Sequence, residues 1–71
     1  MDIVNATKAA IENECAITRP KLSKENIAIM PERCYKVNAY QIIDTAKKAP
    51  IRRWAPQVED ITAKDWTIVK I

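Results

Sequence analysis

The sequence predicts an α+β fold, with an N-terminal helix and a short C-terminal helical turn packed on a small antiparallel sheet. Three features lead to this prediction. Apolar residues near the N-terminus recur at helical spacing, short runs of β-forming residues follow, and prolines or polar turns separate those runs closely. The 71 residues form one domain, 1–71, because the chain is too short for two hydrophobic cores.

The first predicted element is a helix over residues 2–14, DIVNATKAAIENE. Asp2 is a residue type favoured at the N-cap, and Asn5 and Glu12 are expected to face water. The apolar residues at helical spacing form the face expected to pack on the sheet: Ile3, Val4, Ala10 and Ile11.

β-forming residues predict the strands that follow, over 15–19, 26–30, 34–44, 51–54 and 65–71. Pro20 and Pro31 are expected to end the first two, and the third reads as one broken strand or two short ones. A polar turn is expected over 21–25. A lysine-containing turn over 45–50 would let 51–54 pair back on 40–44 as a hairpin.

Residues 56–63, PQVEDITA, predict the short C-terminal helix. Pro56 would stand at its start, where a missing N–H costs no hydrogen bond. Asp60 then lies within this helix and Asp65 just after it. Either carboxylate could cap a backbone amide or accept from a ligand hydroxyl, and capping is the commoner role.

Glycine and histidine are both absent, which excludes several kinds of site. A Gly-rich phosphate loop and a dinucleotide-binding fingerprint cannot form. Catalytic dyads or triads that contain histidine cannot form either. Cys15 and Cys34 can make at most one disulfide, and they cannot complete a four-ligand zinc site. We therefore expect neither catalysis nor a metal nor a cofactor.

We expect no signal peptide, and no apolar run approaches the ~20 residues needed to cross a bilayer. A cytoplasmic protein with reduced thiols is the expectation. Below about 70–80 residues, a single core rarely supplies more than ~3–5 kcal/mol without a further source of stability. Because disulfides and zinc are poor options here, we expect a homo-oligomer.

The net charge of +3, from 12 basic and 9 acidic residues, mildly favours an anionic partner. Nucleic-acid-binding proteins usually carry a denser basic stripe, so DNA or RNA is not the favoured partner. The basic residues instead occur as scattered pairs: Lys21 and Lys24, Arg33 and Lys36, Lys47 and Lys48, and Arg52 and Arg53.

Both tryptophans fall within 52–66. In an extended 51–54, alternation places Arg52 and Trp54 on one face, an arrangement suited to a nucleobase stacked beside a phosphate. The alternative is that Trp54 packs on the sheet and Arg52 covers its ring, and composition alone favours this second interpretation. Trp66 opens an apolar strand and is expected in the core.

The spaced residues of the C-terminal half are Trp54, Pro56, Asp60, Ile61, Ala63, Asp65 and Trp66. They resemble the pattern W-x-P-x-x-x-D-[LI]-x-A-x-D-W, which closes the small proteins of the second Thoeris anti-defence family. Residues 3–19 are similar to that family's amphipathic first helix, which leads into a strand with an arginine, here Arg19. The resemblance covers essentially the whole chain.

The turn after the first strand departs from the family pattern. Relatives often carry a tryptophan and glycines there, whereas this chain has PKLSKEN over 20–26. Leu22 is then the residue in the place of the aromatic, and the ligand preference can differ accordingly.

The resemblance implies a sponge, a non-catalytic protein that binds a cyclic nucleotide signal of a bacterial immune system and withholds it from its effector. Such proteins bind cyclic ADP-ribose isomers, or in some cases cyclic oligonucleotides, and assemble as homotetramers. A phage-encoded member would act in the host cytoplasm. The ligand-binding residues expected here are Arg19 and Arg52 for phosphate, Trp54 for a base, Asp60 as a polar contact and Leu22 as a wall.

Two other functions stay open. The first is a small nucleic-acid-binding accessory protein that uses Arg52 and Trp54 on single strands. Its binding would weaken steeply with salt, unlike binding in a closed pocket. The second is a protein-binding module that inhibits a host enzyme, which would release no small molecule when heated.

Overall fold

The computed structural model describes the backbone of residues 1–34 and 37–71 and the side chains of residues 1–31 and 39–71. The helices in this part of the chain are α1 (Ile3–Asn13), α2 (Pro20–Ser23) and α3 (Val58–Thr62). The strands are β1 (Ala16–Thr18), β2 (Ile27–Cys34), β3 (Val37–Asp44), β4 (Ala49–Arg53) and β5 (Thr67–Val69). The predicted α+β class is confirmed.

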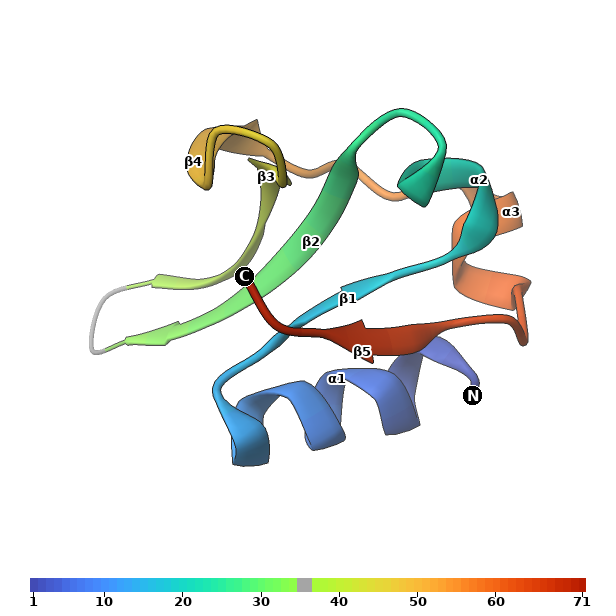
Figure 1. The fold of residues 1–71 in the computed structure, drawn as a ribbon. Helices are drawn as coiled ribbons and strands as arrows, with labels where there is room; N and C mark the ends of the chain where they lie inside the picture. Colours follow the sequence, from blue (N-terminus) through green and yellow to red (C-terminus); the bar gives the residue numbers. More distant parts are fainter. Residues whose placement is uncertain (35–36) are drawn as a thin grey trace.

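The strands form one antiparallel sheet in the order β4-β3-β2-β1-β5. The last strand therefore pairs with the first, with Ala16 opposite Val69 and Thr18 opposite Thr67. Figure 1 shows α1 running along β1 and β5, while α2 and α3 gather at one end of the sheet. This arrangement brings the short helices, which are distant in sequence, to the same place.

Helix α1 packs on the sheet through a narrow face of small residues. Asp2 caps the helix as predicted, because its Oδ1 accepts from the Asn5 N–H at 2.8 Å. The buried residues of the helix are Ile3, Ala6 and Ala10. Val4 and Ile11, predicted on this face, are instead 59% and 37% exposed. Each follows a buried residue directly and so lies about 100° further round the helix.

The core is a row of isoleucines that runs across the central strands. Ile17 of β1 faces Ile29 of β2, and Ile29 faces Ile42 of β3. Trp66, only 1% exposed, packs in the same cluster, which confirms its predicted place in the core. Full burial of an isoleucine side chain contributes about 1.5–3 kcal/mol to the stability of the fold.

Of the two prolines near the first strands, Pro20 acts as predicted and Pro31 does not. Pro20 ends β1 but begins α2, where the sequence indicated only a polar turn, because its fixed φ suits the first helical position. β2 does not end at Pro31 but continues to Cys34. β1 begins only at Ala16, so Pro31 has its strand partner on the β3 side, and its missing N–H removes no bond to β1.

The boundaries of the later elements also differ from the predicted ones. Cys34 belongs to β2 and not to the strand predicted over 34–44, of which 35–36 lie outside the described residues. The hairpin of 40–44 with 51–54 is confirmed, although β4 begins earlier, at Ala49. α3 is shorter than predicted and starts after Pro56, with Gln57 as its N-cap. β5 covers only the middle of 65–71.

Cys15 is a buried free thiol, and the side chain of Cys34 lies outside the described residues. No helix in the described part of the chain combines the length and apolar character that a bilayer crossing requires.

Candidate ligand-binding site

A cleft of about 330 Å³ opens where α2, the end of β4 and the start of α3 meet over the core residue Ile42. Its volume falls within the range of roughly 300–1,000 Å³ that is usual for small-molecule sites. The residues that line it are Lys21, Leu22, Glu25, Ile42, Arg52, Trp54, Ala55, Gln57 and Asp60. Apolar, cationic and acidic groups therefore meet in one hollow.

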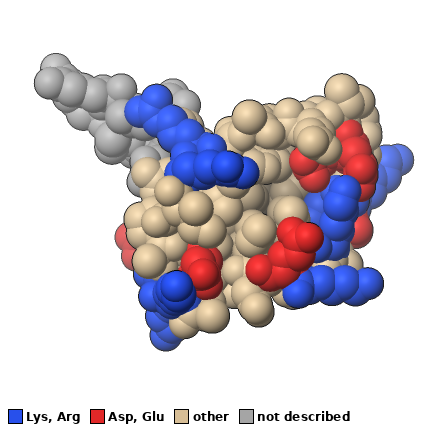
Figure 2. All heavy atoms as spheres, turned by 90° about the horizontal axis from the view of Figure 1, so that it is seen from above, with Lys and Arg blue, Asp and Glu red and all other residues tan. Residues whose placement is uncertain are grey.

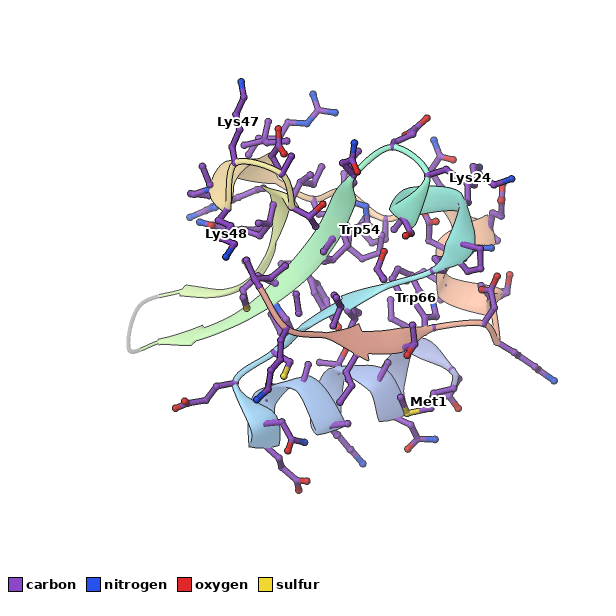
Figure 3. The ribbon with its side chains drawn as sticks, viewed as in Figure 1. Met1, Lys24, Lys47, Lys48, Trp54 and Trp66 are labelled. Atoms are coloured by element: carbon purple, nitrogen blue, oxygen red, sulfur yellow. The ribbon has the colours of Figure 1, made fainter. Side chains whose placement is uncertain are left out.

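Trp54 supplies the aromatic part of the cleft from a fixed position. Its backbone N–H donates to the Tyr40 carbonyl oxygen at 2.9 Å, which extends the pairing of β4 with β3. Its ring stands edge-on to Tyr40, with centroids 5.4 Å apart, and to Trp66 at 5.8 Å. Both tryptophans lie in the interior in Figure 3. Trp54 is thus half-buried against the core, and it also lines the cleft. The packing agrees with the second interpretation from the sequence, while stacking on a base stays a prediction.

Cations border the cleft on two sides. Arg52 is opposite Ile42 in the β3–β4 register and therefore shares its face of the sheet, as the alternation along 51–54 predicts. It is exposed, and no carboxylate among the described residues forms an ion pair with it. Lys21 of α2 pairs with Glu59 of α3 at 3.0 Å, and both side chains are more than half exposed. An exposed pair of this kind is weak, so Lys21 remains available to an anion.

Asp60 is the acidic wall of the cleft, and it is held from two directions. Its Oδ2 accepts from the Gln57 backbone N–H at 3.2 Å, which is the predicted capping role, and its Oδ1 accepts from Arg19 Nη1 at 3.0 Å. Arg19 Nε donates to Asp65 at 2.8 Å. Arg19 and Asp60 are each only 8% exposed, so the contact between them is shielded from water, whereas the Asp65 side chain is about half exposed.

The charge of Arg19 is fixed by its partners. The hydrogen bond to Asp65 is the largest influence and raises the pKa of the Arg19 guanidinium; burial opposes it, and the bond to Asp60 adds to it. Because this pKa is raised on folding, the stabilisation is fully present below the ordinary arginine pKa. It is lost only as pH rises through the still higher folded-state value. Arg19 is therefore a permanent cation beside Asp60.

The structure brings four of the five predicted ligand residues to the cleft: Leu22, Arg52, Trp54 and Asp60. Arg19 is not among the lining residues. It lies behind Asp60, with two of its donors occupied by carboxylates and its guanidinium carbon 5.9 Å from the centre of the Trp66 ring. Within the described residues, no group of three or more His, Cys, Asp or Glu side chains is placed to hold a metal ion.

Sequence reasoning missed five of the lining residues: Lys21, Glu25, Ile42, Ala55 and Gln57. Two of them, Lys21 and Gln57, follow from helix signals that were present in the sequence. Pro20 marks a first helical position, which places Lys21 beside Leu22 on α2 rather than in a turn. Gln57, three residues before Asp60, is the N-terminal half of a capping box.

Comparison with known families gives one result that spans the chain. The model of the Tad2-like family, described as the Thoeris anti-defense 2-like domain, matches residues 1–69. Neither curated proteins nor solved structures yield a match. The matched region contains every helix and strand described above and the whole cleft. The chain therefore belongs to the Thoeris anti-defense 2-like family, and its role is an anti-defence one.

Proposed function

We propose that the protein is a non-catalytic sponge, which binds a cyclic nucleotide immune signal and so blocks bacterial anti-phage defence. The ligand would be a cyclic ADP-ribose isomer or a cyclic oligonucleotide, bound in the host cytoplasm. One observation carries this proposal in a chain of this family. The half-buried Trp54 shares a cleft with Arg52, which pairs with no carboxylate in the described part of the chain, so a flat base and a phosphate can be bound side by side.

Each wall of the cleft suits one part of such a ligand. Trp54 and Leu22 offer apolar surface to a base, and stacking on an aromatic is worth about 1–3 kcal/mol. Arg52 and Lys21 can bind phosphates, and Asp60 can accept from a hydroxyl or amino group. A ligand of about 35 heavy atoms at ~0.3 kcal/mol per atom could reach about −10 kcal/mol. That corresponds to a dissociation constant of about tens of nanomolar, which is sufficient for sequestration.

The ligand should leave the site chemically unchanged. The chain contains no histidine, and both Asp60 oxygens already accept hydrogen bonds from the protein. Asp60 is therefore not a free general base at the cleft. Incubation with a cyclic nucleotide, followed by heat release and mass determination, should return the intact ligand. Recovery of a hydrolysed product at more than one turnover per site would identify an enzyme instead.

We propose a homotetramer as the functional assembly. The core is small, and α3 beside the cleft exposes Val58 and Ile61, which a second subunit could cover. Light scattering should give a mass of about 32 kDa for a tetramer of the 8.1 kDa chain. A monomer mass at micromolar concentration would contradict this assembly.

A thermal-shift assay with a panel of cyclic nucleotides tests the function directly. A ligand at 100 times its dissociation constant adds about 2.7 kcal/mol of apparent stability. Arg52→Gln and Arg53→Gln form a matched pair, because both remove one exposed cation from β4 but only Arg52 lines the cleft. The first change should weaken binding and the second should leave it nearly unchanged. Equal effects of the two changes would exclude the cleft as the site.

Single-stranded nucleic acid is the competing ligand for the same residues. Figure 2 shows basic and acidic groups interspersed on the face in view, without a continuous basic stripe. This distribution favours a small ligand in a cleft over a long polyanion. The salt dependence separates the two, because affinity for a strand falls steeply with salt while affinity for a ligand enclosed in a cleft falls less.

A further inference from the structure

We infer that Arg19 is a positioning residue for this cleft: it orients the carboxylate of Asp60 and offsets its charge, so that an anionic ligand can be bound beside it. The inference rests on the proposed function. It replaces the direct phosphate contact that the sequence suggested for Arg19 with an action through a neighbouring side chain.

The geometry connects Arg19 to the cleft through Asp60. Arg19 Nη1 donates to Asp60 Oδ1 at 3.0 Å, and Asp60 lines the cleft while Arg19 does not. The opposite oxygen of the carboxylate accepts from the Gln57 N–H. With one oxygen fixed by a buried guanidinium and the other by a helix N-terminus, the plane of the carboxylate is set before any ligand arrives.

The carboxylates around Asp60 outnumber the cations, and this is why Arg19 matters for the binding of an anion. Arg19 and Lys21 face three carboxylates in one connected network: Glu59, Asp60 and Asp65. The network thus carries one negative charge in excess. Lys21 lies at its exposed end, so Arg19 is the only buried cation among the described members. Without Arg19, the buried carboxylate of Asp60 would face a bound phosphate uncompensated.

Two substitutions in the same network separate this role from a structural one. Arg19→Gln makes the wall more negative, whereas Asp65→Asn makes it more positive and leaves the Arg19–Asp60 contact in place. Arg19→Gln removes two hydrogen-bonded ion pairs and Asp65→Asn removes one, so each should lower the melting temperature. On a purely structural role for Arg19, both would also weaken binding. The inference predicts instead that Arg19→Gln weakens the binding of an anion, whereas Asp65→Asn leaves it unchanged or strengthens it.

The experiment is calorimetric titration of the full chain with cyclic ADP-ribose and with cyclic di-AMP, using whichever binds more tightly. Arg19→Gln should weaken the affinity about fivefold or more, while Asp65→Asn should leave it unchanged or strengthen it up to about threefold. In an Asp60→Asn background, Arg19→Gln should change affinity by less than about twofold, because the carboxylate through which it acts has been removed. Circular dichroism melts test whether each variant is folded, and Arg19→Gln, which removes a buried cation, is titrated only if it is.

The outcomes are distinct. If the unmodified chain binds neither these two probes nor any member of the cyclic-nucleotide panel, the proposed function falls and this inference falls with it. If the chain binds but Arg19→Gln has no effect, or has the same effect with and without Asp60, Arg19 is not a positioning residue although the function stands. If Arg19→Gln does not fold, Asp65→Asn decides alone: weaker binding of the anion overturns the inference, and unchanged or tighter binding supports it.

Discussion

The indole Nε1 of Trp66 donates a hydrogen bond to the backbone carbonyl oxygen of Asp60 at 2.9 Å. The residue that fills the core is therefore bonded directly to the residue that forms the acidic wall of the cleft. Trp54 closes the unit, because its ring contacts Trp66 on the core side and borders the cleft on the other. The spacing of these residues along 54–66 thus builds one structural unit that joins the core to the site.

Trp66→Ala should lower the free energy of unfolding by about 3–5 kcal/mol, the usual cost of truncating a buried large aromatic. The change also leaves the buried carbonyl of Asp60 without its donor. A domain of this size has little stability in excess, so the variant is expected to be largely unfolded at 25 °C. Trp66→Phe, which keeps a ring but loses the bond, should cost less. Urea denaturation followed by circular dichroism measures both.

Trp54→Ala should weaken ligand binding by about 1–3 kcal/mol, the scale of lost base stacking. The variant should stay folded, with a smaller loss of stability than Trp66→Ala, because Trp54 is only half-buried. Titration with the ligand identified by thermal shift gives the first quantity, and denaturation gives the second. Unchanged binding by a folded Trp54→Ala protein would mean that this ring serves only the core.

Local signals in the sequence predicted which helices and strands form better than they predicted where each one begins and ends. The N-cap at Asp2 and the hairpin of β3 with β4 depend on neighbouring residues, and both were predicted correctly. Pro31 was misjudged because its effect depends on how far β1 extends alongside β2. Val4 and Ile11 were placed in the core because apolar character alone cannot show how narrow the buried face of α1 is.

The same holds for the cleft: contacts that depend on neighbouring residues were predicted, and contacts between distant residues were not. Alternation predicted that Arg52 and Trp54 share a face, and the structure places both in the cleft. The position of Arg19 could not be predicted, because its partners Asp60 and Asp65 lie more than 40 residues away in the sequence. Only the pairing of β1 with β5 brings them together. An arginine in a strand was therefore assigned to a ligand, whereas its donors are occupied by carboxylates of the same chain.

Stability should depend on Arg19 far more than on Lys21, although both form ion pairs with acidic residues near α3. Arg19→Gln should cost about 3–5 kcal/mol, because it leaves the buried Asp60 carboxylate uncompensated. Lys21→Gln removes a pair whose members are both well exposed and should cost no more than about 1 kcal/mol. Chemical denaturation compares the two variants. Similar losses would show that the Arg19 network is weaker than its burial suggests.

The turn between β3 and β4 offers a stabilising change with a control next to it. Lys48 adopts a left-handed conformation, with φ at 53°, which glycine adopts without the strain caused by a Cβ atom. Lys48→Gly should therefore raise the free energy of unfolding by up to about 1 kcal/mol. Lys47, also exposed in this turn, is not among the residues with positive φ, so Lys47→Gly should be neutral or destabilising through the greater entropy of the unfolded chain. Both changes remove one lysine charge, so a difference between them in urea denaturation reports backbone conformation and not electrostatics. Equal shifts for the two variants would rule out conformational strain at Lys48 as the cause.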